Sequence, residues 1–473
     1  MNCDNCSARF RSPVALPVML CTNRHQVCST CAKTIRQCKI CDAPPPAIRM
    51  NTHVMELMMR LEDKSLQKGL DPNILGHFAS AEDILILKGI YNTSLFNFLR
   101  SLMGIDPELP VTIRDVFKLR DLRISGEVKL HSLDGLEFCI YLESLSIDTK
   151  QGETRKVVDF SPLSFLTGLE ELRLNHFEFI TTLTTFRNLR KLKKLYLKGA
   201  RLLPCLDGIH DFGGVLELLD VSYCSSLTDI SRLQNVQNLR TLYLSGCSEL
   251  TIVDSLRHLS SLTELYLNDC LLLSDISSLA GLSNLSVLDL SKCTGVETLH
   301  SLPTNLRSLI VADLPRLSSL IGVDHCCILN SFTLCNLENL TSISSLGHFS
   351  SLSFISISSC PKLSEFSSLA QHKNLTRIEI SACCVDNLNF IKGLKQLEKL
   401  YLENLDKLID ISVVTECQRL RKVRFINCSV ASFSPLLLCP NLEYVYVSGT
   451  FASDLSVVAG SLQQRNVVLD VFT

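Results

Sequence analysis

Residues 239–250 read LRTLYLSGCSEL, and the same pattern returns at 262–273 as LTELYLNDCLLL and at 285–296 as LSVLDLSKCTGV. Each stretch has the form LxxLxLxxC, followed after two further residues by Leu or Val, and each begins 23 residues after the one before. A pattern that returns at a fixed period indicates stacked copies of one structural unit, because no single copy can bury its own apolar face. The first leucine of this frame, the anchor leucine, recurs at Leu119, Leu142, Leu169, Leu192, Leu216, Leu239, Leu262, Leu285, Leu306, Leu329, Leu352, Leu375, Leu397, Leu420 and Leu442.

Each repeat divides into a strand-like half and a shorter connecting half. In LxLxx, apolar and polar residues alternate, which predicts a short strand with leucines facing inward and the intervening residues facing outward. The other half, such as LTDISRLQNVQN at 227–238, is too short for a full helix and predicts a 3-10 or extended segment. The pattern resembles leucine-rich repeats. The resemblance implies an α/β solenoid of about 15 repeats of about 23 residues, with a parallel sheet on its concave face, over residues 119–473 including a C-terminal cap.

The ninth position of the frame holds a cysteine in seven repeats. A small side chain with a weak S–H donor suits a buried turn, where it can lie beside backbone carbonyls. We therefore expect a ladder of free thiols within the core and not metal ligands or disulfides. These residues are Cys224, Cys247, Cys270, Cys293, Cys360, Cys383 and Cys428.

The third, fifth and seventh positions of the frame face the concave surface. They place tyrosines there among charged side chains of both signs, and aromatic anchors contribute much of the free energy of protein interfaces. We expect this face to bind a protein partner; the alternative is that these are ordinary exposed strand residues. The candidate contact residues are Tyr196, Tyr243, Tyr266, Tyr401 and Tyr446.

A second cysteine population lies near the start of the sequence, where seven cysteines and one histidine fall within 39 residues. They form four closely spaced pairs, and such pairs bring two donors to one tetrahedral Zn²⁺. Eight donors make two closed four-coordinate sites, as structural zinc requires, whereas free cysteines or a lone redox pair need no such spacing. We expect two structural zinc ions, held by Cys3, Cys6, Cys21, His25, Cys28, Cys31, Cys38 and Cys41.

The histidine is the fourth of the eight donors, and this order resembles a RING finger over residues 1–46. The resemblance implies recruitment of a ubiquitin-conjugating enzyme, with Ile35 in the second contact loop. The chain departs from ligases of this family at four residues, Asn5, Lys39, Ile40 and Asp42. The resemblance also implies a cross-brace, with one zinc on Cys3, Cys6, Cys28 and Cys31 and the other on Cys21, His25, Cys38 and Cys41.

Residues 47–118 are predicted to form a helical connector and an N-terminal cap. The three prolines at 44–46 end any regular element and act as a stiff spacer. After them, Val54, Leu57, Met58 and Leu61 fall at i, i+3, i+4 and i+7 and predict an amphipathic helix of about four turns. It would pack on the RING-like segment or the next domain, or pair with a second copy. Residues 80–104 predict one or two further helices that cap the repeats.

Composition limits the remaining possibilities. The formal net charge is −2, which argues against nucleic acid as the partner, and no apolar run reaches the roughly 18 residues of a membrane helix. Because no apolar segment precedes Cys3, we expect no export signal and a reducing compartment, the cytoplasm or the nucleus. The repeats contain no catalytic constellation.

A RING-like segment joined to cysteine-bearing repeats resembles the trypanosomatid leucine-rich-repeat/RING-finger proteins, an expression-site-associated family linked to adenylate cyclase regulation. We expect an interaction protein whose repeats select a protein partner and whose RING finger recruits a ubiquitin-conjugating enzyme, as in a RING-type ubiquitin ligase. The alternative is a non-enzymatic adaptor, such as an adenylate cyclase regulator or a nuclear scaffold, with a structural RING. The departures at Asn5, Lys39, Ile40 and Asp42 favour this alternative.

Overall fold

The chain forms two compact units, residues 1–176 with 185–192 and residues 177–184 with 193–473. The computed structural model describes residues 17–19, 26–28, 49–50, 93–105 and 118–472, apart from 125–129, 131, 132, 134, 135, 149–156, 158, 347, 348 and 451.

The first unit contains a small antiparallel sheet, a helix and three parallel strands. In the small sheet β1 (Pro17–Met19) lies between β2 (Gln26–Cys28) and β3 (Arg49–Met50). Helix α4 (Thr93–Leu102) buries Leu99 and lies within the stretch predicted to be helical. The parallel strands are β4 (Asp121–Ile124), β5 (Ser144–Asp148) and β6 (Glu171–Asn175), and two 3-10 helices, η3 (Leu136–Phe138) and η4 (Ser161–Phe165), lie between them in the sequence.

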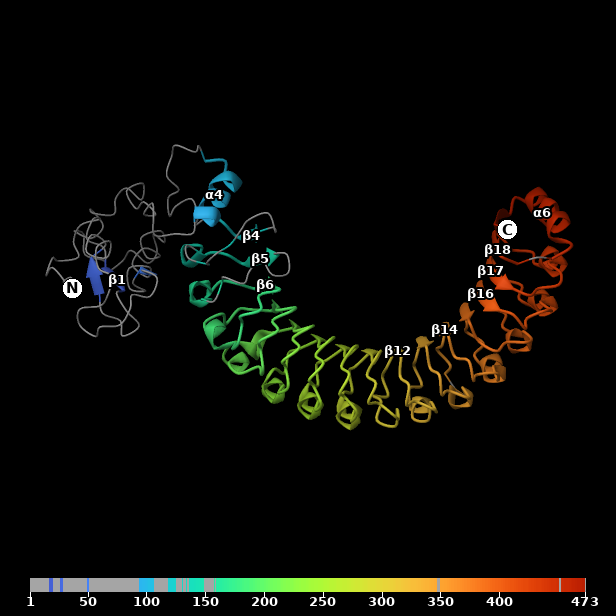
Figure 1. Cartoon of the computed structure of the whole chain (residues 1–473), viewed down its shortest axis with the longest axis horizontal. Helices are drawn as coiled ribbons and strands as arrows, with labels where there is room; N and C mark the ends of the chain where they lie inside the picture. The colour runs from blue at the N-terminus through green and yellow to red at the C-terminus, as the bar shows by residue number, and fades with distance from the viewer. Residues whose placement is uncertain are drawn as a thin grey trace. The chain divides into compact units, whose positions relative to one another are not determined.

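In its described residues, the second unit is a parallel sheet of thirteen strands whose spatial order follows the sequence. Figure 1 shows its strands along the inner side of a curve and its 3-10 helices along the outer side. The strands are β7 (Lys194–Tyr196), β8 (Leu218–Asp220), β9 (Thr241–Tyr243), β10 (Glu264–Tyr266), β11 (Val287–Asp289), β12 (Ser308–Ala312), β13 (Ser331–Cys335), β14 (Phe354–Ser358), β15 (Arg377–Ser381), β16 (Lys399–Leu405), β17 (Lys422–Cys428), β18 (Tyr444–Ser448) and β19 (Val468–Phe472).

The frame leucines form the core, as the sequence predicts. Every anchor leucine from Leu142 to Leu442 is buried, and Leu119 is half-buried. Along the strands burial alternates: in β9 the central Leu242 is fully buried while Thr241 and Tyr243 are half-buried. The solenoid, its parallel sheet and the inward direction of the leucines are therefore confirmed.

The connecting halves fold mostly as single 3-10 turns, and acidic side chains begin several of them. The Oδ1 atom of Asp229 accepts a hydrogen bond from the backbone N–H of Ser231 at 2.7 Å, and Asp275 does the same for Ser277 at 2.8 Å. These turns are η5 (Thr184–Phe186), η6 (Ile209–Asp211), η7 (Gly213–Val215), η8 (Ser231–Asn235), η9 (Asp254–His258), η10 (Ser277–Gly281), η11 (Val323–His325), η12 (Ser344–Leu346), η13 (Ser367–Gln371), η14 (Asn389–Ile391), η15 (Ser412–Glu416) and η16 (Ser434–Leu438).

The ninth-position cysteines form the predicted ladder of buried free thiols. In most of these repeats the Sγ–H group reaches the sixth-position carbonyl of the preceding repeat. Cys247 donates to the carbonyl of Val221 at 3.3 Å and Cys270 to that of Leu244 at 3.3 Å. Burial raises the pKa of the Cys270 thiol to about 12, so the group is a neutral donor at physiological pH.

The eighth position of the frame takes a left-handed backbone conformation from the repeat of Leu169 onward. Gly246 has φ 73° and Asp269 has φ 63°, and even Tyr223 has φ 59°. This residue turns the chain out of the strand and lets the following cysteine point into the core. The need for positive φ accounts for the many Gly, Asn and Asp residues at this position.

The C-terminal end of the described chain adds two elements after β18, the strand of the last repeat. Helix α6 (Leu455–Gln464) buries Val458 and Leu462, and β19 pairs with β18 as a further parallel strand. The predicted amphipathic helix that contains Val54, Leu57, Met58 and Leu61 lies outside the described residues. No helix in the described part of the chain has the length and apolarity to cross a membrane.

Candidate functional site: the concave sheet face

Strand register arranges the fifth-position residues of the frame as one row across the sheet. Asp220 of β8 lies opposite Tyr243 of β9, Tyr243 opposite Tyr266 of β10, and Tyr266 opposite Asp289 of β11. Neighbouring strands lie about 4.8 Å apart, so these four residues span about 14 Å. We call them the Asp–Tyr–Tyr–Asp row.

The two central tyrosines of this row stack face to face. The ring centroids of Tyr243 and Tyr266 are 4.6 Å apart, and the ring planes differ by 9°. The Tyr266 hydroxyl donates to the carboxylate of Glu264 at 3.4 Å. Burial, followed by the charge of Glu264, raises the pKa of Tyr266 to about 12 and raises the pKa of Tyr243 as well.

Three carboxylates, those of Asp220, Glu264 and Asp289, lie on the strands that carry the stacked rings or flank them. Asp220 accepts a hydrogen bond from the backbone N–H of Ser222 at 2.9 Å, and Asp289 accepts one from that of Ser291 at 2.9 Å. Among the described residues, neither aspartate nor Glu264 forms an ion pair. All three are half-buried, so this part of the sheet presents negative charge beside an aromatic surface.

The arginines of the later strands lie against aromatic rings and carboxylates of the same face. The guanidinium of Arg377 lies 5.1 Å from the ring centroid of Phe354 and 5.3 Å from that of Tyr401, and its Nε donates to Glu379 at 2.6 Å. In the same way, the guanidinium of Arg424 lies 5.0 Å from the ring centroid of Tyr446, and its Nε lies 3.1 Å from the carboxylate of Glu403. Tyr401 and Tyr446, both predicted contact residues, therefore already lie beside a cation of their own chain.

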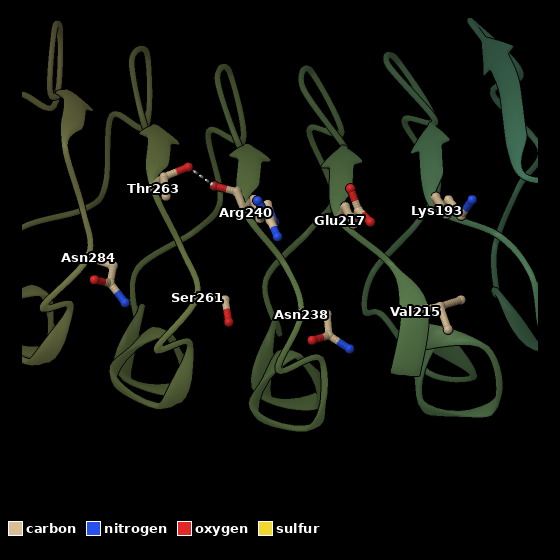
Figure 2. Close-up of a pocket in the computed structure, with 8 residues that line it drawn as sticks. All are labelled: Lys193, Val215, Glu217, Asn238, Arg240, Ser261, Thr263 and Asn284. Carbon is tan, nitrogen blue, oxygen red and sulfur yellow. Dashed lines mark hydrogen bonds between the residues drawn. The ribbon is translucent and has the colours of Figure 1, made fainter.

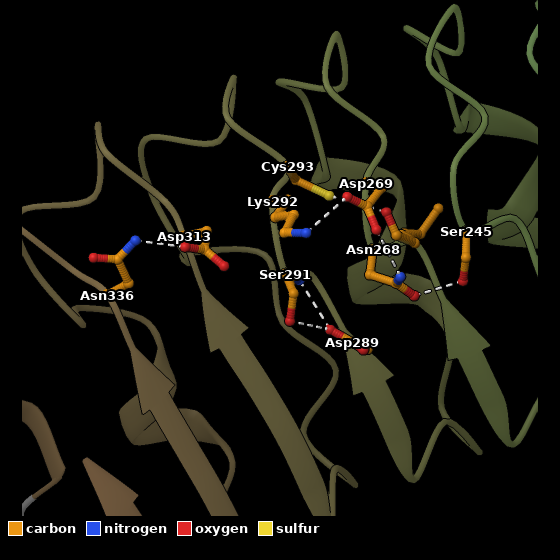
Figure 3. A network of polar contacts seen from close by, with 10 residues as sticks. Ser245, Asn268, Asp269, Asp289, Ser291, Lys292, Cys293, Asp313 and Asn336 are labelled. Atoms are coloured by element: carbon orange, nitrogen blue, oxygen red, sulfur yellow. Dashed lines mark hydrogen bonds and ion pairs between the residues drawn. The ribbon is translucent and has the colours of Figure 1, made fainter. Parts of the chain in front are cut away.

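A set of polar contacts follows the C-terminal ends of β9 to β13 (Figure 3). The Ser245 hydroxyl donates to Asn268 at 2.5 Å, and Lys292 pairs with Asp269 at 3.4 Å. These seventh- and eighth-position side chains link neighbouring repeats along the edge of the concave face. The sequence interpretation did not single them out, although the Gly, Asn and Asp residues at the eighth position were a usable signal.

An open hollow of about 590 Å³ lies at the other ends of the strands (Figure 2). Polar groups in its lining already form hydrogen bonds between neighbouring repeats. The Asn238 amide donates to the carbonyl of Gly214 at 2.5 Å, and the Thr263 hydroxyl donates to that of Arg240 at 3.0 Å. The hollow therefore follows from the spacing of the repeats. Its lining residues are Lys193, Val215, Glu217, Asn238, Arg240, Ser261, Thr263 and Asn284.

The structure places all five predicted tyrosines half-buried on strands of the second unit. It brings Tyr243 and Tyr266 together and leaves Tyr401 and Tyr446 with arginines; Tyr196 ends β7. Of the predicted zinc ligands, Cys28 is described only as the last backbone position of β2. Ile35 and the other ligands, Cys3, Cys6, Cys21, His25, Cys31, Cys38 and Cys41, lie outside the described residues.

Comparison with known proteins agrees with the repeat fold. Residues 230–324 match the model of the family described as Zer-1-like, leucine-rich repeats, and a search of curated proteins gave no match. The crystal structure of an internalin from Listeria monocytogenes is similar, with 21% identity, a TM-score of 0.54, and coverage of 75% of this chain and 94% of that one. A leucine-rich-repeat protein from Leptospira interrogans has 17% identity, a TM-score of 0.54, and coverage of 80% of this chain and 98% of its own. These likenesses show the leucine-rich-repeat fold.

Proposed function

We propose that this chain is an interaction protein in which the concave face of the repeats selects a protein partner, and a RING finger at residues 1–46 recruits a charged ubiquitin-conjugating enzyme. One observation carries the first half of the proposal. The Asp–Tyr–Tyr–Asp row presents stacked aromatic rings and carboxylates on an open sheet face, and in the described part of the chain these carboxylates accept hydrogen bonds only from neutral donors.

The donor set near the start of the sequence supports the zinc part of the proposal. Thiolates and one imidazole in four close pairs suit two tetrahedral Zn²⁺ ions, and no donor is left over. The described backbone suits the same scheme: Pro17 of β1 pairs with Cys28 of β2, so the segment joining these antiparallel strands contains Cys21 and His25. The zinc ions would supply folding free energy to this segment.

In this proposal the RING finger contributes position and no nucleophile. It would hold the conjugating enzyme, while the repeats hold the protein to be modified, so transfer depends on both parts of one chain. The non-enzymatic adaptor shares the zinc fold and the repeat surface with the ligase. The two functions differ only in whether the chain accelerates ubiquitin discharge.

The test is ubiquitin discharge from a panel of charged conjugating enzymes in the presence of the purified full-length protein. The matched control is Cys28→Ala, which removes one predicted zinc ligand. We expect wild type to bind two zinc ions per chain by elemental analysis and to accelerate discharge from at least one enzyme, and we expect the variant to lose both properties. A wild-type protein that holds two zinc ions but accelerates discharge from none of the enzymes would refute the ligase and leave the adaptor.

A further inference from the structure

We propose that the Asp–Tyr–Tyr–Asp row, with Glu264 beside it, binds an extended protein segment that carries two basic side chains about four residues apart. The inference rests on the proposed function of the concave face and specifies the chemistry of its partner. The bound segment is cationic, because three features of this part of the sheet favour positive charge.

The first feature is the stacked pair of rings. The faces of tyrosine rings attract Lys and Arg side chains through cation–π interactions. In the same sheet, the guanidinium of Arg377 lies 5.3 Å from the ring centroid of Tyr401, and that of Arg424 lies 5.0 Å from that of Tyr446. The rings of Tyr243 and Tyr266 have no such cation among the described residues.

The second feature is the distribution of charge along the second unit. At β15 to β17, glutamates pair with arginines of the chain itself. At β8 to β11, the donors that reach Asp220, Glu264 and Asp289 from the described residues are all backbone, seryl or tyrosyl groups. Burial is the main cause of the raised pKa of Tyr266, and the nearby charge of Glu264 adds to it. Charge complementarity therefore favours a partner that brings its own cations.

The third feature is spacing. The two aspartates end a row that crosses three strand intervals, about 14 Å. An extended chain advances about 3.3 Å per residue, so basic side chains four residues apart lie about 13 Å from each other. A segment that crosses the strands could place one cation near each aspartate, against the outer face of the stacked ring next to that aspartate.

The test uses fluorescence anisotropy of labelled twelve-residue Ser/Gly peptides with the full-length protein. The first probe carries Arg at its fifth and ninth positions, the second carries Glu there, and the third carries two adjacent Arg residues. We expect the first probe to bind and the second not to bind. We expect the third to bind several-fold more weakly than the first, because adjacent side chains of an extended segment point to opposite faces and only one of them can face the row.

The decisive variant is the triple change Asp220→Asn, Glu264→Gln and Asp289→Asn. It removes three negative charges but keeps the Oδ1 atoms that accept hydrogen bonds from the backbone N–H groups of Ser222 and Ser291. The fold should therefore be kept, and the circular dichroism spectrum should be unchanged. Binding of the first probe should weaken at least about tenfold, as expected when the charged partners of a cation are removed. The matched control makes the same change in net charge at exposed carboxylates off the strands, as Glu249→Gln, Glu338→Gln and Glu365→Gln, and should weaken binding less than twofold.

A second pair of variants tests the rings. Tyr266→Leu should weaken binding by about fivefold through loss of the cation–π contact, whereas Tyr401→Leu should have little effect, because that ring already holds Arg377. Equal losses from the two triple variants, or undiminished binding by the first triple, would overturn the proposal. Ubiquitin discharge does not depend on this row. Intact discharge without peptide binding would therefore reject only the proposed partner chemistry. Peptide binding without discharge would reject only the ligase function.

Discussion

Gly322→Ala offers a sharp test of how closely neighbouring repeats approach. Gly322 precedes η11 with φ 103°, and its N–H donates to Asp324 at 2.9 Å. A Cβ atom there would lie 2.4 Å from the carbonyl oxygen of Leu299 and 2.5 Å from the Cα of His300. Both contacts are with backbone of the preceding repeat, which cannot rotate away as a flexible side chain can.

The expected loss in the free energy of unfolding of Gly322→Ala has two parts. A left-handed conformation costs an alanine about 1–2 kcal/mol, and the overlap adds about 1–3 kcal/mol, as in overpacked cores. Gly393 separates the two parts, because its φ is 74° and an added Cβ would meet only the Lys373 amine, at 3.4 Å. Gly214 serves as the baseline, because its φ is not in the left-handed range and an added Cβ would meet nothing within 4 Å.

Urea unfolding of the full-length protein, followed by far-UV circular dichroism, measures the three changes in the free energy of unfolding. We expect losses of about 2–5 kcal/mol for Gly322→Ala and about 1–2 kcal/mol for Gly393→Ala, and a change within about 1 kcal/mol for Gly214→Ala. Equal effects at Gly322 and Gly393 would refute the close approach of the backbone. A large loss of stability in Gly214→Ala would show that replacing glycine by alanine destabilises the protein for reasons other than backbone conformation or close contact.

Three further changes test the core, the turns and the thiol ladder. Leu288→Ala in β11 removes a fully buried side chain and should lower the free energy of unfolding by about 2–5 kcal/mol, whereas exposed Ser283→Ala should change it by less than about 0.5 kcal/mol. Asp275→Ala removes the acceptor that begins η10 and should cost about 0.5–1 kcal/mol in the same urea titration. Because burial raises the pKa of Cys270 to about 12, the unfolded thiol ionises above about pH 8.5 while the folded thiol stays neutral, so stability should fall with rising pH. Unfolding measured from pH 8 to 10.5 should show a shallower decline for Cys270→Ala, and an unchanged slope would contradict the assigned burial. Iodoacetamide labelling read by mass spectrometry should modify exposed Cys327 before Cys270.

The sequence predicts the repeat core well because the relevant signal is local. Leu242 and Leu244 lie two residues apart, and this alternation is enough to place both side chains in the core. The same frame assigns Cys247 to a buried turn, where the structure has its thiol beside the Val221 carbonyl. Residues 468–472 lack the frame, so β19 was predicted only as part of a C-terminal cap.

The concave face was predictable as a surface, but its contacts were not. One residue per repeat puts Tyr243, Tyr266 and Tyr401 in one row, and the sequence predicts this much. Whether a ring stacks on another ring or holds an arginine depends on side-chain rotamers and on which residue occupies the next strand. The unequal roles of Tyr266 and Tyr401 therefore follow from the three-dimensional arrangement.

Substrate-directed ubiquitin transfer tests the central claim most directly, because it requires both the partner surface and the proposed RING finger. The assay compares two versions of one acceptor protein, fused either to the peptide with two arginines four residues apart or to its glutamate counterpart. The account predicts faster transfer to the arginine fusion, loss of this preference in the Asp220/Glu264/Asp289 triple variant, and its retention in the Glu249/Glu338/Glu365 control. Equal transfer to both fusions by the wild-type protein would contradict the claim that the concave face selects what the chain modifies.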